Sequence, residues 1–217
     1  MRKFALIILT CYCYWILTSF RSSEFKRFYF SGFAQGTSYH ITYYAADSVI
    51  VQRQIDSLLK TIDESLSLYL PGSLVKTWNN SKKGVAVDAH FRTVVKKAQA
   101  VFNDTEGIFD ITVFPLTNAW GFGPVKPAGR PDSATIQAIL PCVNSNLLFW
   151  RGKKLKKKKP CIQIDPNGIA QGYSVDLLAE LLEKNGVINY LVELGGEIRV
   201  KGKKYPSEEY MIIGIEA

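Results

Sequence analysis

A carboxylate, a tight turn and the start of a helix stand within a few residues of one another in the segment "IDPNGIAQG". Asp165 is followed by Asn167-Gly168, and the next residues have the apolar spacing of a helix. Backbone N–H groups at a helix N-terminus favour an anion, and a divalent cation can reconcile that anion with a nearby carboxylate. The pattern therefore predicts a site for a phosphate-bearing ligand. Each residue also has a plain structural interpretation, Asp165 as the cap of the turn and Gly168 as the residue that eases it.

The strand-like run "NYLVEL" ends in residues of a similar kind. Glu193 lies near its end, and Gly195-Gly196 removes side chains where a ligand would approach the backbone. Ligands gather outside the carboxyl ends of parallel strands, so we expect Asp165 and Glu193 to lie at one edge of a sheet. A simple strand-to-strand turn is the alternative interpretation of the two glycines.

These residues need a fold that brings them together, and the chain predicts an α+β fold with a mixed sheet and packed helices. Alternation predicts a strand at "YHITYYA", and apolar spacing predicts helices over about 51–66 and 91–103. "FDITVF" is expected to be a further strand. "LLFW" and "CIQID" are expected to form a hairpin, followed by a helix over about 169–184 and the strand "NYLVEL". Strand, helix and strand in this order predict a βαβ unit with parallel strands.

The composition is that of a globular domain with an excess of positive charge. The chain has 217 residues, is 47% hydrophobic and carries a formal net charge of +8. Seven basic residues lie in one run of nine, from Arg151 to Lys159. A solvated hairpin tip explains this run better than a contact with lipid or nucleic acid, and no other basic stripe alternates with aromatic residues. We therefore do not expect nucleic acid as a partner.

The N-terminus has the pattern of an export signal or a short membrane anchor. A basic start precedes the uncharged, apolar stretch Phe4–Phe20. We assign residues 1–21 to this signal or anchor and residues 22–34 to a linker. Cys11 follows "LIILT", which suggests a lipoprotein, although Thr10 is larger than the residue that usually precedes a lipidated cysteine. Lipidation and a transmembrane anchor both remain open.

The two cysteines outside that segment flank the basic run. Cys142 and Cys161 are able to pair in an oxidising compartment, and two buried free thiols fit the sequence equally well. The sequence has no CxxC, HxH or HExxH spacing, and His40 and His90 are isolated, so a zinc site is not expected.

Several of these segments, taken together, resemble a known family. "GTSYHITY", "LSLYLPGSLVKTWN", "FDITVFPLTNAWGFGP", "IDPNGIAQGYSVDLLAELL" and "YLVELGGEIRVKG" follow the order seen in ApbE-type FAD:protein FMN transferases. The resemblance runs from about Gln35 to Gly202. The string that fits "FDIT-x-x-PL-x-x-x-WGFG" is its most specific part, because neither helix nor strand formation demands it. We accordingly assign residues 35–217 to the N-terminal part of a flavin-transferase domain.

The resemblance implies a reaction and a location. Such enzymes use Mg²⁺, cleave the pyrophosphate of FAD, release AMP, and attach FMN to a Thr or Ser of an exported flavoprotein. They work at the periplasmic face of the inner membrane, which fits an N-terminal anchor. Two alternatives are a non-catalytic FAD-binding protein and a membrane-anchored interaction module whose lysines contact anionic lipid.

The resemblance also implies site residues. The expected FAD contacts are Gln35, Tyr69, Phe109, Asp110, Ile111, Asp165 and Gln171. The carbonyl of Gly168 is the expected magnesium ligand, and Gln171 stands where many members carry Lys or Glu. The family's catalytic His, and the Asp and Thr that complete its magnesium shell, are expected beyond Ala217. The fold is therefore expected to be incomplete at its C-terminus, and no catalytic residue is assigned.

Overall fold

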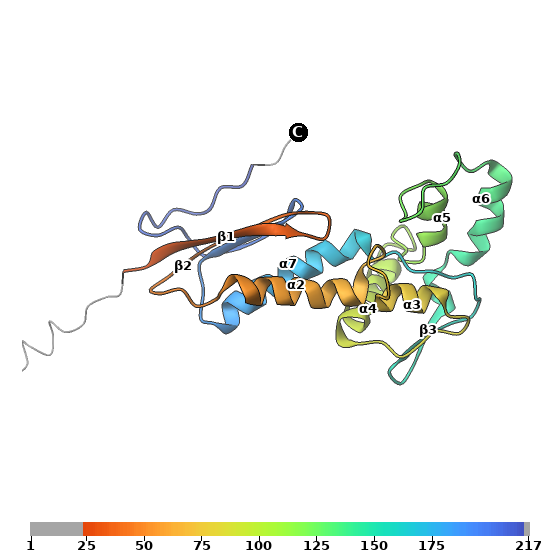
Figure 1. Ribbon diagram of the computed structural model, residues 1–217, viewed down its shortest axis with the longest axis horizontal. Helices are drawn as coiled ribbons and strands as arrows, with labels where there is room; N and C mark the ends of the chain where they lie inside the picture. Colours follow the sequence, from red (N-terminus) through yellow and green to blue (C-terminus); the bar gives the residue numbers. More distant parts are fainter. Residues whose placement is uncertain (1–23, 215–217) are drawn as a thin grey trace, which may run out of the picture.

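The computed structural model describes residues 24–214 (Figure 1). The predicted signal or anchor, with Cys11, lies outside these residues. Within residues 24–214, every helix is too short or too polar to cross a membrane.

A four-stranded sheet forms one end of the molecule. Its strands are β1 (Lys26–Ala34), β2 (Thr37–Ala45), β5 (Tyr190–Leu194) and β6 (Glu197–Lys201), in the order β1-β2-β5-β6. Every neighbouring pair in it is antiparallel. The predicted strands at "YHITYYA" and "NYLVEL" are thus confirmed.

The assignment of residues 22–34 to a linker is wrong, because β1 occupies most of that range. Phe28 and Phe30 are partly buried against the sheet core, and both rings stack on Tyr43 of the neighbouring strand. Tyr29 between them is exposed, and exposed and partly buried residues alternate along the rest of the strand. The residue types do not show this alternation, because Tyr29 and Phe33 are aromatic and yet exposed.

The α+β class is confirmed, but the predicted parallel βαβ unit does not form. The helix is present as α7 (Asn167–Lys184), and β5 follows it. The segment before α7 makes only one parallel bridge, between Val113 and Gln163, and does not enter the sheet that contains β5. Its apolar side chains, Ile162 and Ile164, are buried in a different core.

The other helices and the second sheet make up the rest of the fold. They are α2 (Gln52–Leu66), α3 (Leu74–Asn80), α4 (Ala89–Asp104), α5 (Phe114–Ala119), α6 (Ser133–Ile139), the 3₁₀ turns η1 (Leu140–Cys142) and η2 (Ser145–Leu147), and the hairpin β3 (Leu148–Arg151) and β4 (Lys154–Lys157). Helices α2 and α4 confirm two predictions. The predicted strand "FDITVF" is wrong, because the chain there turns and enters α5 with Pro115 in its first turn.

Residues 24–214 form two hydrophobic cores, and α2 contributes to both. In Figure 1, α2 and α7 lie along the sheet and extend toward the second half of the molecule. Ile55 and Leu59 of α2 pack with α7 and the sheet. Ile62 and Leu66, two turns further on, pack with α3, α4 and the β3–β4 hairpin. One helix thus holds the sheet and the helical half in a defined relation.

The lysine run contains the turn of the β3–β4 hairpin and is mostly exposed, as predicted, but one of its lysines is buried. The turn of the β3–β4 hairpin lies at Gly152-Lys153, and the next four residues form β4. Alternation along this strand buries Leu155 and Lys157 in the core and leaves Lys154 at the surface. The prediction of a solvated run is wrong for Lys157 alone among the basic residues, because successive residues of a strand face opposite sides.

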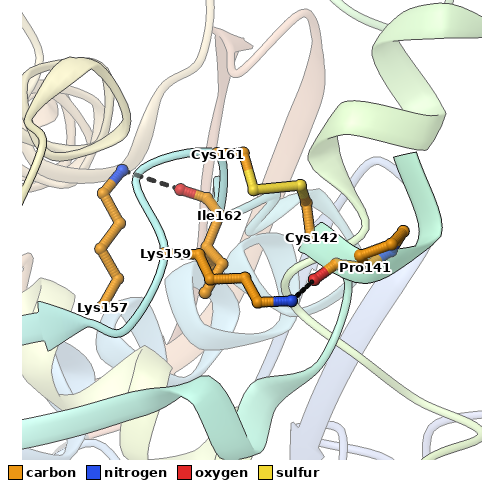
Figure 2. Close-up of a disulfide and its surroundings, with 6 residues drawn as sticks. All are labelled: Pro141, Cys142, Lys157, Lys159, Cys161 and Ile162. Atoms are coloured by element: carbon orange, nitrogen blue, oxygen red, sulfur yellow. Dashed lines mark hydrogen bonds between the residues drawn. A yellow bond between two sulfur atoms is a disulfide. The ribbon is translucent and has the colours of Figure 1, made fainter. Parts of the chain in front are cut away.

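A disulfide joins Cys142 to Cys161, the alternative that the sequence left open (Figure 2). It connects the end of η1 with the segment that leads to α7. Close by, Lys159 Nζ donates a hydrogen bond to the Pro141 carbonyl at 2.9 Å. The covalent bond and this hydrogen bond hold the same two segments together.

Candidate functional site

Two tight turns and the start of α7 meet at one end of the four-stranded sheet. Gln35-Gly36 joins β1 to β2, and Gly195-Gly196 joins β5 to β6, each with positive φ at both residues. The glycine pair is therefore the strand-to-strand turn. A Cβ on Gly195 would lie 2.8 Å from Thr37 Cγ2 and 3.0 Å from Gln171 Nε2, so the turn packs directly against α7.

A cleft of about 970 Å³, here called cleft 1, opens beside this junction. Three of the predicted FAD contacts line it, and they come from distant segments: Gln35 from the first turn, Tyr69 from the loop after α2, and Gln171 from α7. Asn167, at the start of α7, lines it as well. A drug-sized or dinucleotide ligand needs a concavity of this size.

Gln35 is held in an unusual conformation that aims its side chain at α7. Its φ is +54°, a value that few residues other than glycine adopt. Its Nε2 donates to Ser174 Oγ at 2.8 Å, and the Ser174 hydroxyl donates to the Ala170 carbonyl at 2.9 Å. Ser174 is fully buried. The first turn of the sheet is thereby tied to the helix wall of cleft 1.

Tyr69 presents an aromatic surface to cleft 1. Its side chain is 57% exposed, which is unusual for an aromatic residue of this size. The phenol donates to the carbonyl of Phe122 at 3.2 Å, so the ring is held at one end and free on its faces. Trp120 and Phe122 belong to the neighbouring loop and do not line either of the two clefts at α7.

A second cleft of about 800 Å³, cleft 2, lies on the other side of the first turn of α7. Phe109, Gly168 and Gln171 line it, and Gln171 is thus shared between the two clefts. A Cβ on Gly168 would lie 3.4 Å from Phe109 Cε2, so the Phe109 ring packs next to the bare backbone of Gly168. Five of the eight predicted site residues therefore surround the start of α7.

The other three predicted site residues serve the structure around the site and line neither cleft. Asp110 accepts hydrogen bonds from Thr112 and from Ser145 through both backbone and side chain. Ile111 is 1% exposed and its carbonyl accepts from the Asp165 amide at 2.8 Å. Asp165 itself accepts from Thr117 Oγ1 at 2.7 Å and from the Asn167 amide at 3.0 Å. These contacts agree with the interpretation of Asp165 as the cap of the turn before α7.

The start of α7 offers fewer free amides than the sequence suggested. Asn167 N–H donates to Asp165, and the N–H groups of Ile169 and Ala170 donate to the Pro166 carbonyl. Among the described residues, the Gly168 amide has no such acceptor within this turn. The helix dipole favours an anion here, and the Asp165 carboxylate just before the helix already accepts one of its amides.

The residues present do not by themselves make a magnesium site. Within residues 24–214, no group of three or more His, Cys, Asp or Glu side chains is arranged to hold a metal ion. The Gly168 carbonyl is a single neutral ligand, and Mg²⁺ requires six oxygen ligands in octahedral geometry. We derive no step of a reaction through a metal from these residues.

Three carboxylates of cleft 1, those of Asp56, Asp63 and Glu64, were missed in the sequence. Asp56 and Asp63 both line it, seven residues apart on the same face of α2. Burial raises the pKa of the Asp63 carboxyl above its usual range, and a hydrogen bond from Gln35 opposes that shift.

The Asp56 carboxylate accepts a hydrogen bond from the buried Tyr39 hydroxyl at 2.7 Å. Burial, followed by this hydrogen bond, raises the pKa of Tyr39 to about 12. The sequence signal that could have identified these carboxylates is the spacing of Asp56 and Asp63, two turns apart beside the apolar stripe of the predicted helix.

Comparison with known proteins decides the family. A model of the ApbE family matches residues 35–217. The chain belongs to the ApbE family. The ApbE-type resemblance of the five segments is thus confirmed.

Individual relatives agree with this assignment. The chain is 38% identical over 184 residues to the FAD:protein FMN transferase of Vibrio cholerae, which covers 82% of this chain and 55% of that protein. It is 33% identical over 202 residues to the FAD:protein FMN transferase of Haemophilus influenzae. This match covers 87% of this chain and 58% of that protein. The flavin transferase ApbE structure from Vibrio cholerae superposes with a TM-score of 0.82 at 36% identity, over 88% of this chain and 64% of that one. The chain thus spans a little over half the length of the curated relatives it matches.

Proposed function

We propose that this ApbE-family chain binds FAD in cleft 1 and takes part in transferring FMN from FAD to a hydroxyl of a protein acceptor. The observation that carries the proposal is the convergence of Gln35, Tyr69 and Gln171 on one cleft from three distant segments. The relatives named FAD:protein FMN transferase supply the reaction class.

The charges of the cleft suggest how FAD lies in it. Asp56, Asp63 and Glu64 line the α2 wall together with a single cation, Lys60. Carboxylates repel a diphosphate but accept hydrogen bonds from ribose or ribityl hydroxyls. We therefore place an aromatic ring of FAD against Tyr69 in cleft 1 and the diphosphate across the start of α7, where it reaches the Gly168 backbone at the border with cleft 2.

The proposed transfer breaks one phosphoanhydride bond. A Thr or Ser oxygen of the acceptor attacks the phosphorus on the FMN side, the phosphoanhydride oxygen leaves with AMP, and the proton of the acceptor hydroxyl passes to solvent. The residues of this chain bind and orient FAD for that step. Mg²⁺ would neutralise negative charge on the diphosphate, and the Gly168 carbonyl would be a ligand that this chain supplies to it. An exported flavoprotein acceptor and a site at the periplasmic face of the inner membrane complete the proposal.

Binding of FAD to the purified chain, with and without Mg²⁺, is the first test. Tyr69→Ser should weaken FAD binding about tenfold, because stacking on an aromatic ring contributes roughly 1–3 kcal/mol. Tyr29→Ser is the matched control, since Tyr29 is 53% exposed on β1 and lines neither cleft. Calorimetry that detects no FAD binding to the wild type in the presence of Mg²⁺ rules out the proposal.

Incubation with FAD, Mg²⁺ and an acceptor flavoprotein tests the reaction. Covalent flavin fluorescence on the acceptor together with released AMP supports the transferase. Bound FAD without a labelled acceptor supports a non-catalytic FAD-binding protein. Free FMN without a labelled acceptor indicates that the chain only hydrolyses FAD.

A further inference from the structure

The segment that leads into α7 is buried without belonging to a sheet, and a side chain takes the place of a neighbouring strand. Ile164 is 1% exposed. Its carbonyl accepts a hydrogen bond from Asn79 Nδ2 at 2.9 Å, and its amide donates to Asn79 Oδ1 at 2.7 Å. Two residues of adjacent antiparallel strands exchange the same pair of bonds. The Asn79 carboxamide thus supplies both bonds that a strand partner would supply.

A buried lysine extends this contact. Lys157 Nζ donates to the Ile162 carbonyl at 2.8 Å, as Figure 2 shows, and to the Asn79 carbonyl at 3.0 Å. Asn79 and Lys157 are each 5% exposed. Polar groups buried this deeply are kept in place by satisfied hydrogen bonds, because an unmade bond is costly there.

Helix α3 connects this contact to the opposite wall of cleft 1. Asn79 lies near its C-terminal end, and Ser73 caps its N-terminus. The Ser73 hydroxyl donates to the Ser67 carbonyl at 2.6 Å and so closes the loop that carries Tyr69. A helix of 7 residues is about 10 Å long, which sets the spacing between the Tyr69 loop and Ile164.

Ile164 is in turn adjacent to the residues that begin α7. Asp165 follows it and accepts from the amide of Asn167, which lines both clefts. A shift of Ile164 would therefore move the first turn of α7 relative to Tyr69.

We propose that Asn79 is a positioning residue of cleft 1, which holds the first turn of α7 at a fixed distance from the Tyr69 loop through its paired hydrogen bonds with Ile164. The inference rests on the proposed function in taking FAD as the ligand of the cleft. Asn79 itself lines neither cleft and touches no ligand in this role.

Asn79→Asp tests the proposal, because it keeps the size and one acceptor oxygen but places a second acceptor against the Ile164 carbonyl. Asn80→Asp is the matched control, since Asn80 is the next residue of α3, is exposed and makes the same change of charge. Amide hydrogen exchange should become about tenfold faster over residues 163–171 in Asn79→Asp and stay unchanged over 176–184. Unchanged exchange over 163–171, or equal acceleration throughout the chain, overturns the proposal.

FAD affinity gives a second readout that separates this inference from the proposed function. The FAD dissociation constant should rise about tenfold in Asn79→Asp and stay at the wild-type value in Asn80→Asp. Wild-type affinity in folded Asn79→Asp overturns the positioning role and leaves the proposed function standing. Absence of FAD binding to the wild type, with the expected local change in exchange, rejects the proposed function while supporting Asn79 as the residue that positions α7.

The wild type alone provides a test if Asn79→Asp does not fold. Coupling between two sites is reciprocal, so FAD binding should slow exchange of the Ile164 amide severalfold. Exchange of this amide that is identical with and without saturating FAD overturns the proposal.

Discussion

At the scale of single residues, Gln171 offers a direct test of where the diphosphate lies. It borders both clefts and carries no charge of its own. Gln171→Lys should tighten FAD binding about fivefold and Gln171→Glu should weaken it by a similar factor, since a unit charge about 4 Å away in water is worth about 1 kcal/mol. Titration of flavin fluorescence at low salt measures both.

The control for Gln171 must change net charge without entering the site. Gln137 suits this purpose, because it is exposed on α6, lines neither cleft, and α6 lies at the far end of the molecule from the sheet (Figure 1). Gln137→Lys should leave affinity unchanged. Equal effects of both Lys substitutions would attribute the change to overall charge and not to the site.

Lys157 predicts a pH dependence of stability. Burial lowers its pKa to about 8, against about 10.4 for an unperturbed lysine. Between these values the unfolded chain binds more protons than the folded chain, so the contribution of Lys157 to the free energy of unfolding rises with pH. The wild type should therefore gain stability relative to Lys157→Met from about pH 7 to about pH 10.

Urea unfolding of both proteins across this range measures that difference. Groups that titrate in both proteins cancel in it. Lys158→Met serves as the control for the loss of a lysine charge, since Lys158 is exposed at the next position. A constant gap between wild type and Lys157→Met would contradict the prediction.

At the scale of elements, the β5–β6 turn predicts two separable effects. Gly195 and Gly196 both have positive φ, so alanine at either should lower the free energy of unfolding by about 1–2 kcal/mol. Only a Cβ on Gly195 meets other atoms, Thr37 and Gln171 among them, whereas one on Gly196 meets nothing within 4 Å.

Gly195→Ala should therefore weaken FAD binding as well as stability, whereas Gly196→Ala should change stability alone. Thermal unfolding and FAD titration of the two variants distinguish these outcomes. Equal FAD affinities in both variants would show that the turn does not position Gln171.

Helices with a clear periodicity of apolar residues were predictable from the sequence. Segments whose conformation depends on contacts with distant residues were not. Helices α2 and α4 carry long amphipathic patterns that local sequence specifies, and α7 carries a long run of helix-forming apolar residues that pack on both cores. "FDITVF" has strand-forming residues, yet Asp110 captures the amides of Thr112 and Ser145 and bends the chain into a turn. That contact depends on Ser145, which is far away in the sequence.

At the scale of the whole molecule, the disulfide predicts a redox dependence of stability. Cys142 and Cys161 are 19 residues apart, and a crosslink closing a loop of this length contributes about 3 kcal/mol in the chain-entropy account. The Cys142→Ser, Cys161→Ser double variant should lose about that amount. Dithiothreitol should destabilise the wild type equally and leave the double variant unchanged. An unchanged wild type under full reduction would contradict the prediction.

The sequence by itself determined the family, the α+β class and the long helices, because local patterns and motif strings can be recognised without knowing which distant residues are in contact. Through the resemblance it also identified five residues that surround the start of α7, namely Gln35, Tyr69, Phe109, Gly168 and Gln171. Only the tertiary structure decided that the sheet is antiparallel and that "CIQID" pairs with the Asn79 side chain. An extended buried segment can satisfy its backbone with a strand or with side chains, and the choice depends on which partners the rest of the chain brings to it.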